Sequence, residues 1–293
     1  MKILIAIGGK EFSKPTLDLG MKIANSFKSS TTIAYVGKKI SQFSEKDVSV
    51  VHQNLDDREL YRPGIRTLEW AYDFLISKKY IEEKELNKFN DYLLVDEENS
   101  RMKVLLKGQQ SDNIDLIMRT GEIIEQLKNE VEKNNHDITI IGGGGNKGIH
   151  QKLIQFIDSS VFVFKNYSVN KTYKILLPIN ESKGSDMAIE TAINFAKSYK
   201  LDVEIISVPE DRKSIDEVEK ILTKTKEKFS KNKIKSKTKI IEGVAVDSIV
   251  NYANDDSIVI LGVSPKNPIM KYFFGSKPLS IAQKCNCPVL ITK

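Results

Sequence analysis

Short apolar runs alternate with longer amphipathic stretches along the chain, and the same pattern occurs twice. Residues 2–36 align without a gap with residues 174–208. The apolar positions agree through most of the two segments. The positions of the first segment that meet identical residues in the second include Lys2, Ile3, Leu4, Ile7, Ser13, Ala24, Ser26, Lys28 and Val36. Self-similarity at a fixed offset indicates an internal repeat, so the chain is predicted to contain two copies of one structural unit.

Each copy has the pattern of a strand, a helix and a second strand. The runs 2–7 and 174–179 are rich in isoleucine and leucine, as buried parallel strands are. Turn residues follow both runs, and apolar residues then recur three and four positions apart, which predicts a helix. We expect Ser13 and Ser185 to be the N-caps of these helices. The second strands are predicted at 31–36 and 203–208.

The later parts of the two copies also correspond. In the second copy the pattern predicts strands at 174–179, 203–208, 237–242, 257–262 and 289–292, and helices at 185–199, 213–230, 245–254 and 276–285. In the first it predicts a helix at 122–134 and strands at 138–141 and 161–165. Such alternation favours a parallel sheet with helices on both faces. We therefore expect an α/β fold with two tandem open parallel five-stranded sheets, in domains at 1–168 and 172–293.

The first copy carries an insertion of about 50 residues, within residues 40–110. It contains Trp70, which is the only tryptophan of the chain. The pattern predicts a helix at 65–87 and strands at 92–95 and 102–106.

Composition excludes several classes of protein. Of the 293 residues, 40% are hydrophobic and the mean hydropathy is −0.30, which is typical of a folded, water-soluble chain. No apolar run approaches the roughly 18 residues that span a bilayer, and the apolar N-terminus is too short for a signal peptide. We expect a cytoplasmic protein with no membrane partner. Cys285 and Cys287 are too few for a disulfide framework, and we expect them to be buried structural residues.

The net charge of +6 lies entirely in the second half, because residues 1–170 carry equal numbers of basic and acidic residues. Lysines are frequent between residues 220 and 239. Arginine is nearly absent there, aromatic residues are not interleaved, and glutamates intersperse, so a solvated helix face is favoured over a nucleic-acid site. The three histidines form no recognisable triad or metal cluster, and no catalytic residue is predicted.

Candidate ligand-binding residues follow the strands of the second copy. Ligands of open parallel sheets bind beyond the carboxyl ends of the strands, where Asn180, Glu181, Val208 and Gly262 stand. Gly275 and Ser276 then open the last predicted helix, whose N-terminus can receive a phosphate. Three nearby lysines add positive charge: Lys266, Lys271 and Lys277.

The second copy resembles the universal stress protein family. The resemblance lies in the spacing Gly262-x2-Pro265-x9-Gly275-Ser276, which follows the family's Gly-x2-Gly-x9-Gly-Ser/Thr, and in the ending Cys287-Pro288-Val289-Leu290-Ile291. It covers most of residues 173–293 and, more weakly, 1–36 and 115–165. The whole chain thus resembles a tandem member of the family, with strand order 3-2-1-4-5 in each half.

The resemblance implies a regulatory stress-response protein that binds ATP or AMP in its second half, with Mg²⁺ only if the ligand is ATP. The implied nucleotide-binding residues are Pro178, Asn180, Glu181, Val208, Gly262, Val263, Gly275, Ser276 and Lys277. Val208 would present its backbone to adenine, Asn180 would meet the ribose, and Gly275 and Ser276 would meet phosphate. It also implies that 161–165 and 289–292 pair within the chain as an internal pseudo-dimer. Whether two chains form a homodimer stays open.

Two departures from the family pattern leave alternatives open. Pro265 replaces the second glycine, so that position has no N–H for phosphate, and Asn180 replaces the aspartate that follows the first strand. In the first copy Gly8 stands at that place, and Gln155 falls where Gly-Ser is required. The first copy is therefore interpreted as degenerate. The alternative function is a nucleotide-free scaffold whose insertion binds an unknown protein partner, and a slow ATPase is the most that enzymatic activity would amount to.

Overall fold

The computed structural model describes residues 1–37, 64–81, 94–97, 101–104, 114–143, 147–168, 171–209, 215–263 and 277–293. The chain forms two compact units, Met1–Ile140 and Ile141–Lys293. Within the described ranges, no helix is long and apolar enough to cross a membrane.

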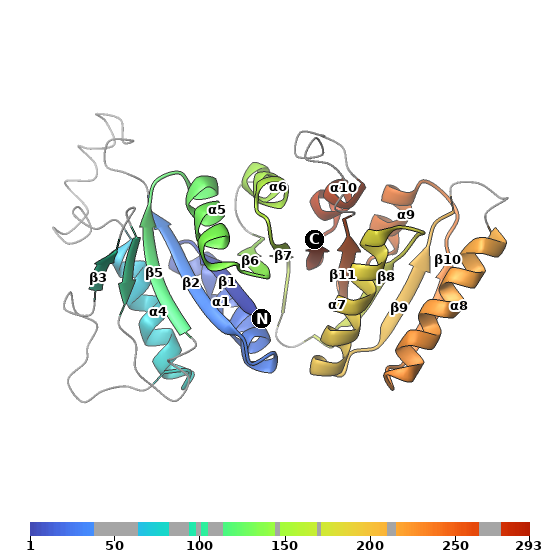
Figure 1. Cartoon of the computed structure of the whole chain (residues 1–293), viewed down its shortest axis with the longest axis horizontal. Coiled ribbons are helices and arrows are strands. Elements are labelled where there is room, and N and C mark those ends of the chain that lie inside the picture. The colour runs from blue at the N-terminus through green and yellow to red at the C-terminus, as the bar shows by residue number, and fades with distance from the viewer. Residues whose placement is uncertain are drawn as a thin grey trace. The chain divides into compact units, whose positions relative to one another are not determined.

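The C-terminal unit alternates strands and helices as the sequence predicts (Figure 1). Its strands are β7 (Ser160–Phe164), β8 (Lys174–Pro178), β9 (Val203–Ser207), β10 (Ser236–Ile240), β11 (Ser257–Gly262) and β12 (Val289–Thr292). Its helices are α6 (Lys147–Phe156), α7 (Lys183–Tyr199), α8 (Ile215–Lys231), α9 (Ala245–Tyr252) and α10 (Lys277–Lys284). All nine elements expected in the second copy are present, with ends that differ by a few residues.

The strand order in this unit is β10-β9-β8-β11-β12, which confirms the expected order 3-2-1-4-5. All four pairs along this row are parallel. The central strands are apolar and buried on both faces; Leu176, Ile205, Val259 and Ile260 are 0% exposed. β9 lies on one side of β8, and β11 lies on the other side. The direction in which the chain adds strands therefore reverses between β8 and β11. Open parallel sheets have a crevice at such a point.

The last strands of the two repeats, β7 and β12, pair with each other. β7, which ends the first repeat in sequence, runs antiparallel to β12, with Val163 opposite Val289 and Val161 opposite Ile291. This pairing was expected from the family resemblance, and it covers one edge of each strand.

Each of these two strands is followed by a lysine that caps a helix of the other repeat. Lys165 Nζ donates to the carbonyl oxygens of Ala282 at 2.5 Å, Gln283 at 3.1 Å and Cys285 at 3.2 Å, at the end of α10. Lys293 Nζ donates to the carbonyl of Ile157, which follows α6. The ammonium groups satisfy carbonyls that have no partner within a helix and lie at the negative end of its dipole.

The N-terminal unit contains β1 (Lys2–Ile7), α1 (Lys10–Ser26), β2 (Ser30–Gly37), α4 (Ile65–Ser77), β3 (Leu94–Glu97), β4 (Arg101–Val104), β5 (Ile114–Thr120) and α5 (Ile123–Asn134). β6 (Ile138–Gly142) begins in it. The strand order β6-β1-β2-β5 repeats that of the second copy, and the hairpin β3–β4 continues the sheet antiparallel beyond β5. The insertion therefore supplies two further strands as well as α4, and most of its other residues lie outside the described ranges.

A buried charge network joins this hairpin to α5. Glu130 on α5 is 0% exposed and pairs with Arg119 of β5 at 2.6 Å and with Arg101 of β4 at 3.1 Å. Burial alone raises the pKa of the Glu130 carboxyl, but the hydrogen bonds and charges of Arg101 and Arg119 outweigh it and hold that pKa below its ordinary value. Glu130 is therefore ionised at neutral pH, and Arg101 ties the inserted hairpin to the repeat.

The expected N-caps are wrong by a few residues in both copies. α1 begins after Gly9 and α7 after Ser182, so Ser13 and Ser185 lie inside the first turn of each helix. Their hydroxyls nevertheless make the same bond, since Ser13 Oγ accepts from Gly8 N at 2.7 Å and Ser185 Oγ accepts from Asn180 N at 3.0 Å. The serines hold the strand-to-helix turn of each repeat and do not cap its helix.

Candidate functional site

A cavity of about 640 Å³ opens at the carboxyl ends of β8, β9 and β11 in the C-terminal unit. Its volume lies within the range of small-molecule sites, which is roughly 300–1,000 Å³. It occupies the crevice where the strand order reverses. Its lining comprises Pro178, Ile179, Asn180, Glu181, Ser182, Ser185, Ser207, Val208, Pro209, Glu217, Val218, Ile221, Ala245, Ile249, Leu261, Gly262, Val263, Lys277, Pro278 and Ile281.

Four helices contribute their first turns, or residues close to them, to this lining. Ser182 is the N-cap of α7, Glu217 lies in the first turn of α8, and Ala245 and Lys277 are the first residues of α9 and α10. The helices start here because each follows the carboxyl end of a parallel strand. Each start presents backbone N–H groups and a partial positive charge, so the cavity favours an anionic group.

A serine pair fixes the side chain of Asn180 at the polar end of the cavity. Asn180 Oδ1 accepts from Ser182 Oγ at 2.6 Å and from Ser185 Oγ at 2.8 Å. Each hydroxyl in turn accepts a backbone N–H, since Ser185 N donates to Ser182 Oγ at 3.3 Å and Asn180 N donates to Ser185 Oγ. The two hydroxyls also lie 3.3 Å apart, but their shorter contacts are with Asn180, and there they donate to the amide oxygen. The amide nitrogen then faces away from α7, and Asn180 lines the cavity.

Apolar side chains from two helices and one strand end form another part of the wall. Val218 and Ile221 come from α8, Ala245 and Ile249 from α9, and Val208 follows β9. Val218 and Ile249 are nearly buried, while Ile221 and Ala245 are half-buried. A wall of this composition suits a flat, weakly polar ring such as a nucleobase.

Gly262 lines the cavity where β11 approaches α7. A Cβ placed on Gly262 would lie 1.7 Å from the carbonyl oxygen of Gly184 and 2.2 Å from its carbonyl carbon. Both contacts are with backbone, which cannot rotate away. The packing of β11 against α7 therefore requires glycine at 262 regardless of any ligand.

The structure brings together seven of the nine predicted nucleotide-binding residues in this cavity: Pro178, Asn180, Glu181, Val208, Gly262, Val263 and Lys277. Gly275, Ser276 and Pro265 lie outside the described residues, as do Lys266 and Lys271. The prediction missed the apolar wall from α8 and α9, because it considered only strand ends and the start of the last helix. The spacing of Val218 from Ile221 and of Ala245 from Ile249 places each pair on one face of its helix, which is the signal that could have located these residues.

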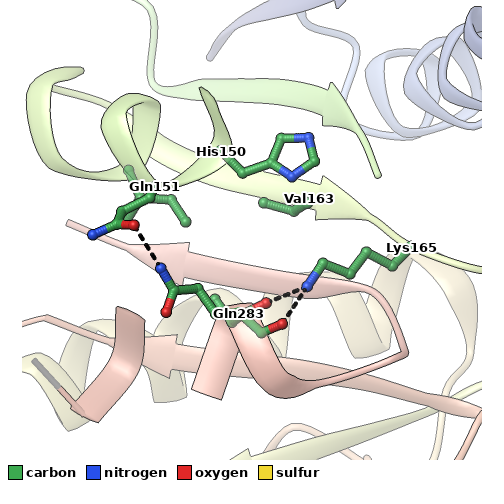
Figure 2. A pocket seen from close by; sticks show the side chains of 7 residues that line it. His150, Gln151, Val163, Lys165 and Gln283 are labelled. Carbon is green, nitrogen blue, oxygen red and sulfur yellow. Dashed lines mark hydrogen bonds between the residues drawn. The ribbon is translucent and has the colours of Figure 1, made fainter. Parts of the chain in front are cut away.

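A much smaller cavity of about 10 Å³ lies between α6, β7 and α10 (Figure 2). It is lined by His150, Gln151 and Lys165 among others, and Gln283 Nε2 donates to Gln151 Oε1 at 2.8 Å across it. This volume is close to that of a single water. Burial lowers the pKa of the His150 imidazole, so the ring is neutral at pH 7. The cavity is a packing defect beside the lysine cap and no ligand site.

Cys285 and Cys287 are free thiols, 1% and 2% exposed, which confirms that they are buried. In the described ranges, no group of three or more histidine, cysteine, aspartate or glutamate side chains could hold a metal ion.

Comparisons with known proteins show what this chain is similar to. Residues 172–293 match the model of the universal stress protein family. The chain is 25% identical over 138 residues to universal stress protein MJ0531 of Methanocaldococcus jannaschii, in an alignment of 41% of this chain and 81% of the relative. A solved universal stress protein of Archaeoglobus fulgidus is 15% identical, with a TM-score of 0.64 over 100% of this chain and 96% of its own.

A protein of unknown function from Pseudomonas aeruginosa, PA1789, has a TM-score of 0.59 at 13% identity, over 100% of this chain and 92% of its own. At these identities the solved structures show a shared fold that includes both repeats. The match to the universal stress protein family is thus confined to residues 172–293, while the whole chain shares the fold of a solved universal stress protein.

Proposed function

We propose that the C-terminal unit binds an adenine nucleotide in the 640 Å³ cavity, and that the protein acts in a stress response through the difference between its liganded and unliganded states. The observation that carries this proposal is the division of one cavity into two chemical regions. An apolar wall from α8 and α9 suits the base, and four helix starts suit a phosphate.

In this proposal each part of the ligand has its own place in the cavity. The base lies against Ala245 and Ile249, with the backbone after β9 at Val208 beside it. The ribose meets Asn180, and the phosphate lies toward the first turn of α10 at Lys277. Gly275 and Ser276, which precede that turn in the sequence, remain the proposed phosphate contacts.

Two universal stress proteins have solved structures as nucleotide complexes, one with cAMP and one, from Archaeoglobus fulgidus, with dAMP. Their TM-scores against this chain are 0.36 and 0.34, so the proposal rests on the cavity of this chain.

Calorimetric titration of AMP, ADP and ATP into the full chain tests the proposal. We expect saturable binding that Ala245→Phe abolishes, because the larger side chain fills the apolar region. Val246→Phe is the matched control: Val246 is the next residue of α9, is equally half-buried and does not line the cavity. Absence of binding for all three nucleotides, or equal loss in both variants, would contradict the proposal and favour the nucleotide-free scaffold.

A further inference from the structure

Asn180 lines the cavity and presents a hydrogen-bond donor to it. Its Oδ1 already accepts from Ser182 and Ser185, and the planar amide then directs Nδ2 away from those hydroxyls. Within the described part of the chain, no hydrogen bond involves Nδ2. An amide nitrogen donates to oxygen and does not coordinate Mg²⁺, which takes oxygen ligands.

The helix starts add to this preference. The N-termini of α7, α8, α9 and α10 reach the same cavity, and their partial positive charges repel a cation while they attract an anion. They supply at this place the electrostatic stabilisation that Mg²⁺ supplies to a nucleotide elsewhere.

Two carboxylates of the cavity would instead attract a cation. Glu181 and Glu217 line the cavity and are exposed, and Lys277 is the basic residue among the described lining. Exposed carboxylates are hydrated and interact weakly with a charge across water. The weak repulsion that remains acts more strongly on a tetra-anionic ligand than on a dianionic one.

We infer that the cavity takes its nucleotide as a metal-free anion of low charge, such as a nucleoside monophosphate, with Asn180 Nδ2 and the four helix starts in place of Mg²⁺. This inference rests on the proposed nucleotide binding and deepens it. It makes Asn180 the residue that determines whether a divalent metal takes part.

The test is calorimetric titration of AMP, and separately of ATP, into the full chain in EDTA and in millimolar Mg²⁺. We compare wild type with Asn180→Asp. The aspartate keeps both serine hydrogen bonds as an acceptor and lies at the N-terminus of α7, where a negative charge is stabilised, so this variant folds. Asn251→Asp on the exposed face of α9 is the control for the same change in net charge outside the cavity.

For wild type we expect AMP affinity that changes less than about twofold between EDTA and Mg²⁺, and that exceeds ATP affinity. For Asn180→Asp we expect AMP binding about tenfold weaker in EDTA, since a donor is replaced by a charged acceptor, with part of that loss restored by Mg²⁺. Asn251→Asp binds as wild type does.

Wild-type binding that requires Mg²⁺, tighter binding of ATP with Mg²⁺ than of AMP, or unchanged binding by Asn180→Asp in EDTA would each overturn the inference while leaving nucleotide binding intact. Absence of saturable binding in every condition would instead overturn the proposed function and this inference with it.

Discussion

Gly262 of β11 lies directly against the backbone of Gly184 in α7, at the wall of the candidate site. A Cβ on Gly262 would lie 1.7 Å from the Gly184 carbonyl oxygen, well inside any van der Waals contact. Gly262, which the family resemblance implies as a nucleotide-binding residue, thus has a packing role, because two backbones meet here without side chains.

Gly262→Ala tests this packing role. We expect it to lower the free energy of unfolding by about 2 kcal/mol or more, because the backbone of β11 or α7 must move. Urea denaturation measures the loss. Gly9→Ala is the matched control, since a Cβ at Gly9 meets nothing within 4 Å; equal stability of the two variants would contradict the close approach.

Glu130→Gln tests the buried charge network of the N-terminal unit. Removal of the carboxylate leaves Arg119, which is 1% exposed, without its countercharge, and the expected loss of stability is about 3–5 kcal/mol. Glu132→Gln on the same helix removes only an exposed pair with Lys128 and is expected to change stability by less than about 1 kcal/mol. The measurement is chemical denaturation at neutral pH, and a small effect of Glu130→Gln would show that the arginines find other partners.

Lys165→Met tests the lysine cap of α10. The variant keeps the length of the side chain but loses three hydrogen bonds to carbonyls, and we expect a loss of about 1–2 kcal/mol in the C-terminal unit. Lys284→Met is the control, because Lys284 forms an exposed ion pair with Asp247. Hydrogen exchange of α10 amides reports the effect locally; unchanged protection in Lys165→Met would argue against the cap.

The buried histidines predict a pH dependence. Burial lowers the pKa of His136 and of His150 below the ordinary value of 6.5. As the pH falls through about 6.5, the unfolded chain binds protons that the folded chain does not, so stability decreases. Above the ordinary value both states are neutral and this contribution is flat. Denaturation midpoints between about pH 5 and 8 measure it, and a flatter profile is expected for His136→Gln combined with His150→Gln.

Glu130 adds a second loss at lower pH. Its pKa is below the ordinary value in the folded state, so its stabilising effect is complete above the unfolded value and disappears as the pH falls through the folded one. The acid part of the profile is therefore expected to be reduced in Glu130→Gln and retained in the histidine variant.

Much of the fold could be predicted because the local sequence pattern of each repeat agrees with the secondary structure that it forms. The strands around Leu176 and Ile260 are apolar throughout, and the helices between them keep a regular apolar face, so periodicity located every element of the second copy. Helix starts were less certain, since Ser182 and Ser185 both stand before the apolar positions of α7 and only the geometry of the turn decides which one caps.

Long-range relationships could not be predicted in the same way. The partnership of Glu130 with Arg101 depends on the pairing of an inserted hairpin with β5, and no local pattern reports it. The apolar wall of the cavity depends on where α8 and α9 meet at the strand ends. Among the candidate site residues, Asn180 directly follows one predicted strand and Val208 ends another.

The most direct measurement of the central claim is a crystal structure of the full chain grown with excess AMP. The account predicts the base against Ala245 and Ile249, the ribose beside Asn180 and no metal ion at the phosphate. A structure with AMP bound elsewhere, or with this cavity empty of nucleotide at saturating concentration, would contradict it.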